Sequence, residues 1–294
     1  MRTLVIGASG YLGSRVHRAA AAAGLDVVTA GRSGGHVALD LATATPDAVA
    51  ALIAGIAPEV VVNCAGATGG DLATLTAANV DGPATLVTAL LRLPAVRLVH
   101  LGSAAEYGRG PGEVPVREDE PARPLSPYGV TKLAGTRLVE LGRTAGLPAV
   151  VLRVFNPVGP GAPGHTLAGR AVAELARAVR EHDVVRLGGL DAVRDFVDVD
   201  DVAAAVLAAA TCPLPAHGVV NVGSGTAVSA RELVGTLVDV AGARVRIEEG
   251  GGGSARSADV PWQQADVTAA TATWGWRPRR PLAVSLEGLW QQAA

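Results

Sequence analysis

The chain has 294 residues, enough for one large domain or two unequal ones. Its formal net charge is −2 and only 3% of its residues are aromatic, which argues against a nucleic-acid-binding surface. No apolar run reaches the ~20 residues of a membrane span, and Met1 leads into an apolar strand without a signal-peptide pattern. With two widely spaced cysteines, Cys64 and Cys212, expected as free thiols, these features predict a soluble, cytoplasmic protein.

The first predicted unit is a strand at residues 3–6, a glycine turn at 7–13 and an alanine-rich helix to about residue 23. In the turn, GASGYLG, Gly7 permits a tight bend, Gly10 lets the backbone approach a diphosphate, and Gly13 lets the helix pack on the strand. The free N–H groups at the start of the helix favour phosphate. This unit predicts a dinucleotide site formed by Gly7, Ser9, Gly10, Tyr11, Leu12 and Gly13.

The end of the second predicted strand, at residues 26–30, indicates which dinucleotide is bound. An acidic residue usually stands there to hold the ribose 2′-hydroxyl of NAD, whereas arginine accommodates the 2′-phosphate of NADP. This chain has Gly31 there, followed by Arg32 and Ser33. We predict NADP, with NAD as the alternative if Arg32 is only a solvated loop charge. Asp40, followed by Leu41, is a candidate for binding the adenine amino group.

The third predicted strand, at residues 59–62, ends in small residues where the backbone could pass a cofactor ribose. These are Cys64, Ala65 and Gly66. A helix expected at about 71–92 carries Asn79, a further candidate for the cofactor site and for a proton relay.

Ser103 follows the fourth predicted strand, at residues 96–101. Ligands of open α/β sheets bind beyond the carboxyl ends of the strands, so the Ser103 hydroxyl could reach a substrate oxygen. Taken alone, a serine in this place is more often a turn residue or a helix cap. The residues downstream favour the catalytic interpretation.

Tyr128 and Lys132 are four residues apart in a helix that Ser126 and Pro127 are expected to begin. This spacing puts both side chains on one helical face, about 6 Å apart. An ammonium close by favours the phenolate and brings the pKa of Tyr128 down toward the working range of proton transfer. Lys132 is also the only lysine of the chain: of the 25 Lys and Arg residues, the other 24 are arginine. We predict a catalytic pair, against the alternative of a surface lysine that happens to follow a tyrosine.

Further strands are expected at 149–154, 184–187 and 219–222, and helices at about 167–180, from 229, and at 282–291. A short strand near residue 194 should run into a helix capped by one of the aspartates Asp195, Asp198, Asp200 and Asp201. The D-x-D-D run at 198–201 could bind a metal, but no histidine or second carboxylate cluster accompanies it. The six histidines show no ligand spacing, so no metal site is expected.

In order along the chain, these motifs resemble the extended short-chain dehydrogenase/reductase family of nucleotide-sugar epimerases, dehydratases and reductases. The resemblance rests on residues 7–13, 63–66, Ser103, Tyr128 with Lys132, 153–157 and 194–196. It implies an α/β fold, with a Rossmann-type doubly wound parallel sheet (1–156 plus about 192–224) and a smaller discontinuous substrate domain (about 157–191 plus 225–294). It also implies a homodimer.

The resemblance assigns further residues to the site. Cofactor contacts are implied at Phe155, Pro157 and Val158, and Lys132 would hold the nicotinamide ribose. Substrate contacts are implied at Ser103, Ala104, Tyr128, Asn156, Arg194 and Arg256, with the two arginines clamping the nucleotide diphosphate. The alternative for Arg194 and Arg256 is a solvated surface charge.

Within the family, dehydratases carry Asp-Glu directly after the active-site hydroxyl residue, and this chain has Ala104 and Ala105 there. Segments 102–108, 123–128, 187–196 and 256–261 look most like GDP-4-keto-6-deoxymannose reductases and related 4-ketoreductases. Gly189, where those reductases usually have asparagine, is a departure.

The sequence therefore predicts reduction of a nucleotide-linked (GDP- or dTDP-) 4-keto-6-deoxyhexose by NADPH. Tyr128 would supply the proton, and Ser103 would hydrogen-bond the developing alkoxide. The alternatives are a nucleotide-sugar 4-epimerase with retained NAD and a non-catalytic NADP-sensing regulator.

Overall fold

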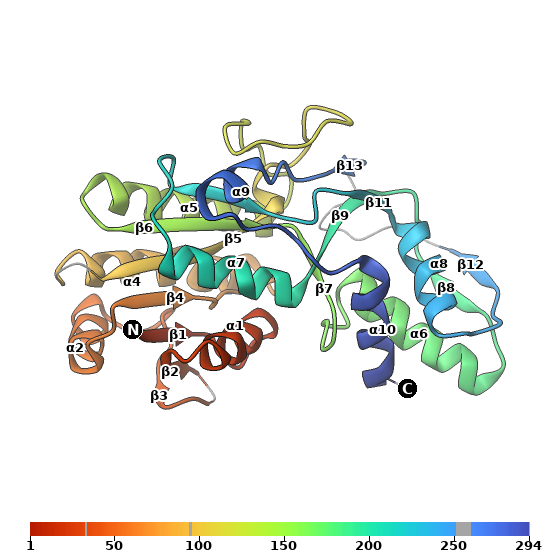
Figure 1. The fold of residues 1–294 in the computed structure, drawn as a ribbon, viewed down its shortest axis with the longest axis horizontal. Coiled ribbons are helices and arrows are strands. Elements are labelled where there is room, and N and C mark those ends of the chain that lie inside the picture. Colours follow the sequence, from red (N-terminus) through yellow and green to blue (C-terminus); the bar gives the residue numbers. More distant parts are fainter. Residues whose placement is uncertain (33, 94–95, 251–259, 294) are drawn as a thin grey trace.

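A computed structural model describes residues 1–293 except 33, 94–95 and 251–259. Its centre is a seven-stranded sheet in the order β10-β6-β5-β4-β1-β2-β3, in which every pairing is parallel. Figure 1 shows this sheet with helices on its faces and a smaller unit at one end. The predicted α/β, doubly wound, Rossmann-type architecture is confirmed.

Apart from the edge strand β3 and the start of β2, the strands of this sheet are short, apolar and buried, as expected of parallel strands between two helical layers. Their bounds are β1 Arg2–Ile6, β2 Asp26–Gly31, β3 Val37–Ala38, β4 Val60–Asn63, β5 Arg97–Ser103, β6 Ala149–Val154 and β10 Val219–Val222. Each predicted strand of the sheet is present within two residues of its expected ends, and β3 was not predicted.

Two helical layers cover the sheet and bury separate apolar clusters against it. One layer contains α1 (Tyr11–Ala22), α7 (Val199–Thr211) and α9 (Thr268–Trp274). The other contains α2 (Pro46–Ile56), α4 (Gly82–Leu90) and α5 (Pro127–Thr144). The predicted caps are confirmed: Ser126 accepts the Gly129 N–H before α5, and Asp198 accepts the Asp200 N–H before α7.

The helix expected at 71–92 is not one regular helix. After α3 (Leu72–Thr76), residues Ala77–Asp81 form a π-helical turn, labelled η1, and α4 follows. Pro83 has no N–H to donate to the carbonyl of Asn79 four residues earlier, which favours a wider turn there. The turn directs the backbone of Asn79 against α5, because a Cβ added to Gly135 would lie 2.3 Å from the Asn79 carbonyl oxygen.

The smaller unit is formed by residues that follow β6 in the sequence. Its strands are β7 Asn156–Val158, β8 Val185–Leu187, β9 Val193–Asp198, β11 Ala227–Ser229, β12 Ile247–Glu249 and β13 Trp262–Gln263. Its helices are α6 Leu167–Glu181, α8 Ala230–Val240 and α10 Leu282–Ala293. β9 pairs with β7, β11 and β13, and the three helices enclose a third apolar cluster.

Strand order reverses between β1 and β4, since the chain runs from β1 out to β2 and β3 and returns on the other side of β1. At such a switch point the loops beyond the carboxyl ends of the two strands separate and leave a crevice for a ligand. The glycine turn after β1 and the small residues after β4 both lie here. None of the described helices is long and apolar enough to cross a membrane.

We expect Gly13→Ala to destabilise the protein by about 1–3 kcal/mol despite the higher helix propensity of alanine. A Cβ at this position would lie 2.1 Å from the Gly7 carbonyl oxygen, so the helix or the strand must move. The control is Gly55→Ala in α2, where nothing lies within 4 Å of the added Cβ and a gain of about 0.5–1 kcal/mol is expected. Urea unfolding of the cofactor-free proteins measures both, and equal stability of the two variants would contradict the close packing.

Candidate active site

The turn between β1 and α1 has the geometry that the glycine motif predicts. Gly7 has φ +79°, and a Cβ there would lie 2.8 Å from the Ala65 nitrogen, so the loops after β1 and β4 are in contact. Helix α1 then starts with Gly10 as its N-cap residue in extended conformation, with no side chain capping its free N–H groups. A diphosphate is the ligand that such an end favours.

A cavity of about 670 Å³ lies beside the start of α1. The predicted cofactor residues Ser9, Gly10 and Tyr11 line it. The Tyr11 hydroxyl donates to the Gly159 carbonyl at 3.2 Å, and Arg15 donates to the Pro160 carbonyl at 2.7 Å. The cavity is therefore walled on one side by the loop that follows β7, and its glycine backbone and free N–H groups fit the phosphates of a dinucleotide.

Asn79 fixes the loop after β4. Its amide group accepts the Ala67 N–H at 2.9 Å and donates to the Ala67 carbonyl at 2.9 Å. It also donates to the Thr131 hydroxyl on α5 at 3.1 Å. A Cβ on Gly66 would lie 3.0 Å from the Asn79 side chain and 4.0 Å from Lys132 Nζ. The predicted residues Gly66, Asn79 and Lys132 are therefore neighbours.

Lys132 is buried, with 6% of its surface exposed, and its ammonium donates to the Leu101 carbonyl of β5 at 2.5 Å. Burial lowers the pKa of Lys132, and the negative charge of Glu106 opposes this shift. Burial also raises the pKa of the Cys64 thiol to about 12, against the charge of Lys132. Lys132 is thus an interior group directed at the carboxyl end of β5, and the surface-lysine alternative is wrong.

Ser103 is the last residue of β5 and the N-cap of the short 3₁₀ helix η2, Ala104–Glu106. Its hydroxyl oxygen accepts the Ala105 N–H at 3.2 Å, which leaves the hydroxyl proton to donate to a ligand. The first turn of α5 packs on η2, since a Cβ at Gly129 would lie 2.5 Å from the Ala105 carbonyl oxygen. Tyr128, the neighbour of Gly129, is half-buried in this turn.

The other predicted site residues have varied surroundings. Arg32 is exposed at the end of β2, and Asp40 accepts the Ala42 N–H. The Phe155 side chain is fully buried against the Tyr107 ring, at 6.3 Å between centroids, so Phe155 would contact a cofactor through its backbone. Ser33 and Arg256 lie outside the described residues.

Other predicted residues are buried or half-buried. Ala104 is buried in η2, Val158 in the smaller unit and Leu41 beside Gly82. Asn156 donates its side-chain amide to the Asp195 carbonyl at 2.8 Å. Arg194 is also buried, which lowers its pKa to about 10. The Arg194 guanidinium donates to the Val193 carbonyl at 2.7 Å, and the solvated-surface alternative for Arg194 is wrong.

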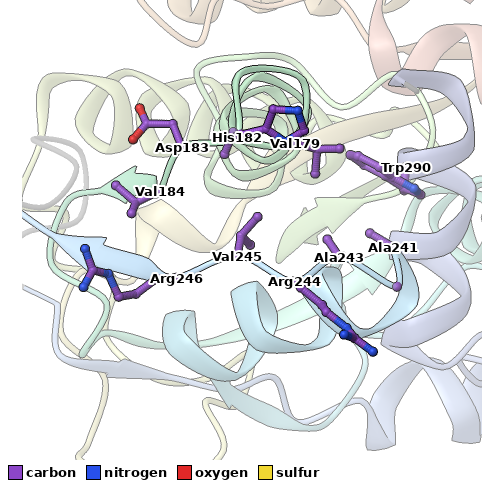
Figure 2. Close-up of a pocket in the computed structure, with 12 residues that line it drawn as sticks. Val179, His182, Asp183, Val184, Ala241, Ala243, Arg244, Val245, Arg246 and Trp290 are labelled. Atoms are coloured by element: carbon purple, nitrogen blue, oxygen red, sulfur yellow. The ribbon is translucent and has the colours of Figure 1, made fainter.

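A second cavity, of about 590 Å³, lies in the smaller unit and is shown in Figure 2. Val179 and His182 at the end of α6, Arg244 and Val245 before β12, and Trp290 of α10 surround it. None of the predicted site residues that the structure describes lines this cavity. In the described part of the chain, no three His, Cys, Asp or Glu side chains are grouped so as to bind a metal.

Comparison with known proteins identifies the family. Residues 3–223 match the profile of the NAD dependent epimerase/dehydratase family. The chain belongs to this family. It is 39% identical to a dTDP-6-deoxy-L-talose 4-dehydrogenase (NAD(P)(+)) of Kitasatospora kifunensis, over 98% of this chain and 94% of the relative. It is 31% identical to a UDP-glucose 4-epimerase of Mycolicibacterium smegmatis, over 96% and 95% of the two chains.

Among solved structures, the fold is similar to that of RMD from Pseudomonas aeruginosa complexed with NADPH. The TM-score is 0.86 and the sequence identity 27%, with 99% of this chain and 98% of that chain covered. Membership of this family of nucleotide-sugar oxidoreductases and epimerases confirms the resemblance and makes this chain an enzyme of that kind.

Sequence reasoning missed a buried ion pair whose carboxylate also accepts the Ser103 N–H. Arg153 of β6 donates through Nε to Glu106 at 2.8 Å, and side-chain exposure is 3% and 0%. The signal was present in the sequence. Arginine stands inside the apolar strand AVVLRV, and a charge buried there requires a partner.

We expect Lys132→Met to raise the unfolding free energy at pH 7 by about 1–2 kcal/mol, because replacing a buried charge by an apolar side chain of similar length removes its desolvation cost. Turnover should be lost in the same variant. Urea unfolding measures the change in unfolding free energy. The control is Arg137→Met at an exposed position, where the unfolding free energy should change little.

The stability gained by Lys132→Met should depend on pH. Folding holds the pKa of Lys132 below its ordinary value of 10.5, so the unfolded chain binds more protons in the window below pH 10.5. Wild-type stability rises with pH in that window, and the advantage of Lys132→Met should shrink as the pH approaches 10.5. A variant less stable than wild type at pH 7 would contradict this account.

Proposed function

We propose that this chain reduces the 4-keto group of a nucleotide-activated 4-keto-6-deoxyhexose, using NADPH and the residues Ser103, Tyr128 and Lys132. The observation that carries the proposal is the approach of α5 to the end of β5. Lys132 bonds the Leu101 carbonyl and Gly129 packs on Ala105, beside the loops of the dinucleotide crevice. This approach supports a site in which Ser103, Tyr128 and Lys132 act together at one end of the sheet.

When bound, NADPH supplies the hydride that adds to C4 of the sugar. Tyr128 gives its phenolic proton to the oxygen that becomes the new hydroxyl. Ser103 donates a hydrogen bond to the same oxygen and stabilises the charge that develops there. Lys132 favours the phenolate that remains on Tyr128 and offers its other N–H groups to the nicotinamide ribose. Asn79, bonded to Thr131 and Ala67, would support a proton relay.

The substrate assignment has two supports. The 39% identical relative is named for oxidation of a dTDP-sugar at C4, which is the reverse of 4-keto reduction. Gly189, in place of the asparagine usual in GDP-4-keto-6-deoxymannose reductases, argues against a guanosine sugar. We therefore favour a dTDP-linked substrate, with its diphosphate held by Arg194 and Arg256. Ala104 and Ala105 supply no acid or base for dehydration.

The proposal includes the two-domain division given above, a homodimer and a cytoplasmic location. The direct test is a panel of dTDP- and GDP-4-keto-6-deoxyhexoses, with NADPH oxidation followed by absorbance and products identified by NMR. Oxidation with a dTDP substrate, giving a 4-hydroxy sugar, supports the proposal. No oxidation with any member of the panel would refute it.

A nucleotide-sugar 4-epimerase is the second candidate, favoured by the relative of that name that matches 96% of this chain. An epimerase oxidises and re-reduces its substrate with one retained NAD, and so turns over without added cofactor. Purified protein that carries NAD and interconverts UDP-glucose and its C4 epimer would establish this alternative.

We expect Tyr128→Phe to lower kcat by about 10²–10⁴-fold, the usual range for loss of a general acid. NADPH affinity should stay within a few-fold of wild type, because the ring remains. Stopped-flow absorbance measures the first quantity and NADPH fluorescence titration the second. Undiminished turnover would show that Tyr128 does not supply the proton.

We expect Arg32→Ala to raise the KM for NADPH by about 10–100-fold, the effect of losing a hydrogen bond to a charged group. Arg32 is exposed at the end of β2 and can reach a 2′-phosphate there. The KM for NADH, which has no 2′-phosphate, is the control and should change little. Equal changes for both cofactors would remove Arg32 from the NADP site.

A further inference from the structure

The Glu106–Arg153 ion pair lies where packing alone does not require charge. Glu106 has no exposed surface and Arg153 is 2% exposed. An apolar pair of similar volume is often at least as stabilising as a buried ion pair, because burying two charges costs their hydration. The location of this pair, one turn beyond Ser103, therefore suggests a role in the site.

Glu106 uses its two oxygens for different partners. Oε2 accepts the Arg153 guanidinium, and Oε1 accepts the backbone N–H of Ser103 at 2.8 Å. The Ser103 hydroxyl oxygen in turn accepts the Ala105 N–H. Together the two bonds fix both the peptide plane of Ser103 and the rotation of its side chain. Such a reciprocal arrangement is a capping box, here formed on the residue proposed to contact the substrate.

The carboxylate is held on several sides. The Arg153 guanidinium lies over the Tyr107 ring, 4.4 Å from its centroid, and the Tyr107 hydroxyl donates to Asn221 at 2.7 Å. A Cβ added to Gly102 would lie 2.7 Å from Glu106 Oε1, so a larger residue there would displace it. These contacts leave Glu106 little freedom to release Ser103.

We propose that Glu106 is a positioning residue for the reaction: its hydrogen bond to the Ser103 N–H holds the Ser103 hydroxyl toward the substrate carbonyl oxygen, and Arg153 keeps the Glu106 carboxylate in place. This inference rests on the proposed role of Ser103. Misplacing a reacting or hydrogen-bonding group by about 1 Å can cost about 100-fold in rate. The negative charge of Glu106, which raises the pKa of Lys132 against the effect of burial, supports the same arrangement.

Two double variants separate positioning from folding, since removing one partner alone leaves an unpaired buried charge. Glu106→Leu with Arg153→Met removes both charges and the acceptor of the Ser103 N–H. Glu106→Gln with Arg153→Met also removes both charges but keeps a carbonyl acceptor. The leucine double variant should lower kcat for a dTDP-4-keto-6-deoxyhexose by about 100-fold. Its Kd for NADPH should stay within about 2-fold of the wild-type value. The second should recover kcat to within about 10-fold of wild type.

Asp201→Asn is the matched control. Asp201 of α7 is a buried carboxylate that likewise accepts backbone N–H groups at 2.9 Å, but its partners are Arg279 and Arg280, which follow α9 and are not residues of the proposed site. This variant should be less stable with unchanged kcat. The proposal is overturned if the leucine double variant keeps wild-type kcat, or if the glutamine double variant is as slow as the leucine one.

Gly102→Ala tests the proposal where the leucine variant does not fold, because it displaces Glu106 Oε1 and leaves both charges in place. It should lower kcat by about 10-fold or more, whereas wild-type kcat would overturn the proposal. NMR of ¹⁵N-serine-labelled protein gives a readout that needs no turnover. The Ser103 amide proton, identified by its absence in Ser103→Ala, should shift upfield in the leucine variant and stay in place in the glutamine variant.

The two proposals can fail separately. A wild-type enzyme that oxidises no NADPH with any 4-keto sugar refutes the proposed function, whatever the NMR spectrum shows. A wild-type enzyme that is active, with an unshifted Ser103 amide in the leucine variant, refutes the positioning role alone.

Discussion

The hydrogen bond from the Lys132 ammonium to the Leu101 carbonyl joins helix α5 to the end of strand β5, and the geometry of the site depends on it. A hydrogen bond and an opposite charge nearby offset part of the cost of a charge in the interior. Lys132 has both, since Glu106 lies close enough to influence its pKa. The side chain therefore has few alternative positions, and the first turn of α5, with Tyr128, is held beside Ser103.

This arrangement requires unusually close backbone contacts, and glycine provides them. Gly129 packs on Ala105, Gly135 on Asn79, and Gly13 on Gly7, and in each case an added Cβ would lie 2.5 Å or less from a backbone oxygen. The contacts at Gly129 and Gly135 fix α5 against η2 and the π-helical turn. The contact at Gly13 fixes α1 against the turn that faces the dinucleotide crevice. The proposed cofactor loops and reacting residues therefore lie on segments that are in direct backbone contact.

The smaller unit contributes to this frame and is not merely attached to it. Gln263 of β13 donates to the Ala104 carbonyl at 2.9 Å, so η2 is held from the smaller unit as well as from β6. Tyr11 of the glycine motif donates to the Gly159 carbonyl in the loop after β7. The unit that would bind the sugar nucleotide therefore contacts both the cofactor turn and the segment that carries Ser103. Residues more than a hundred positions apart meet at the place where hydride and proton would be transferred.

The fold could be predicted from local patterns, and patterns of the same kind led to the proposed reacting residues. Buried parallel strands appear in the sequence as short apolar runs, and the glycine turn has a fixed spacing. Tyr128 and Lys132 are four residues apart, which puts them on one face of a helix. The features that could not be predicted depend on contacts between distant segments. The pairing of Glu106 with Arg153 across 47 positions and the hydrogen bond from Gln263 to the Ala104 carbonyl have no local pattern that predicts them. A charged residue inside an apolar strand predicts that an opposite charge lies nearby. Which residue supplies that charge depends on the order of the strands in the sheet.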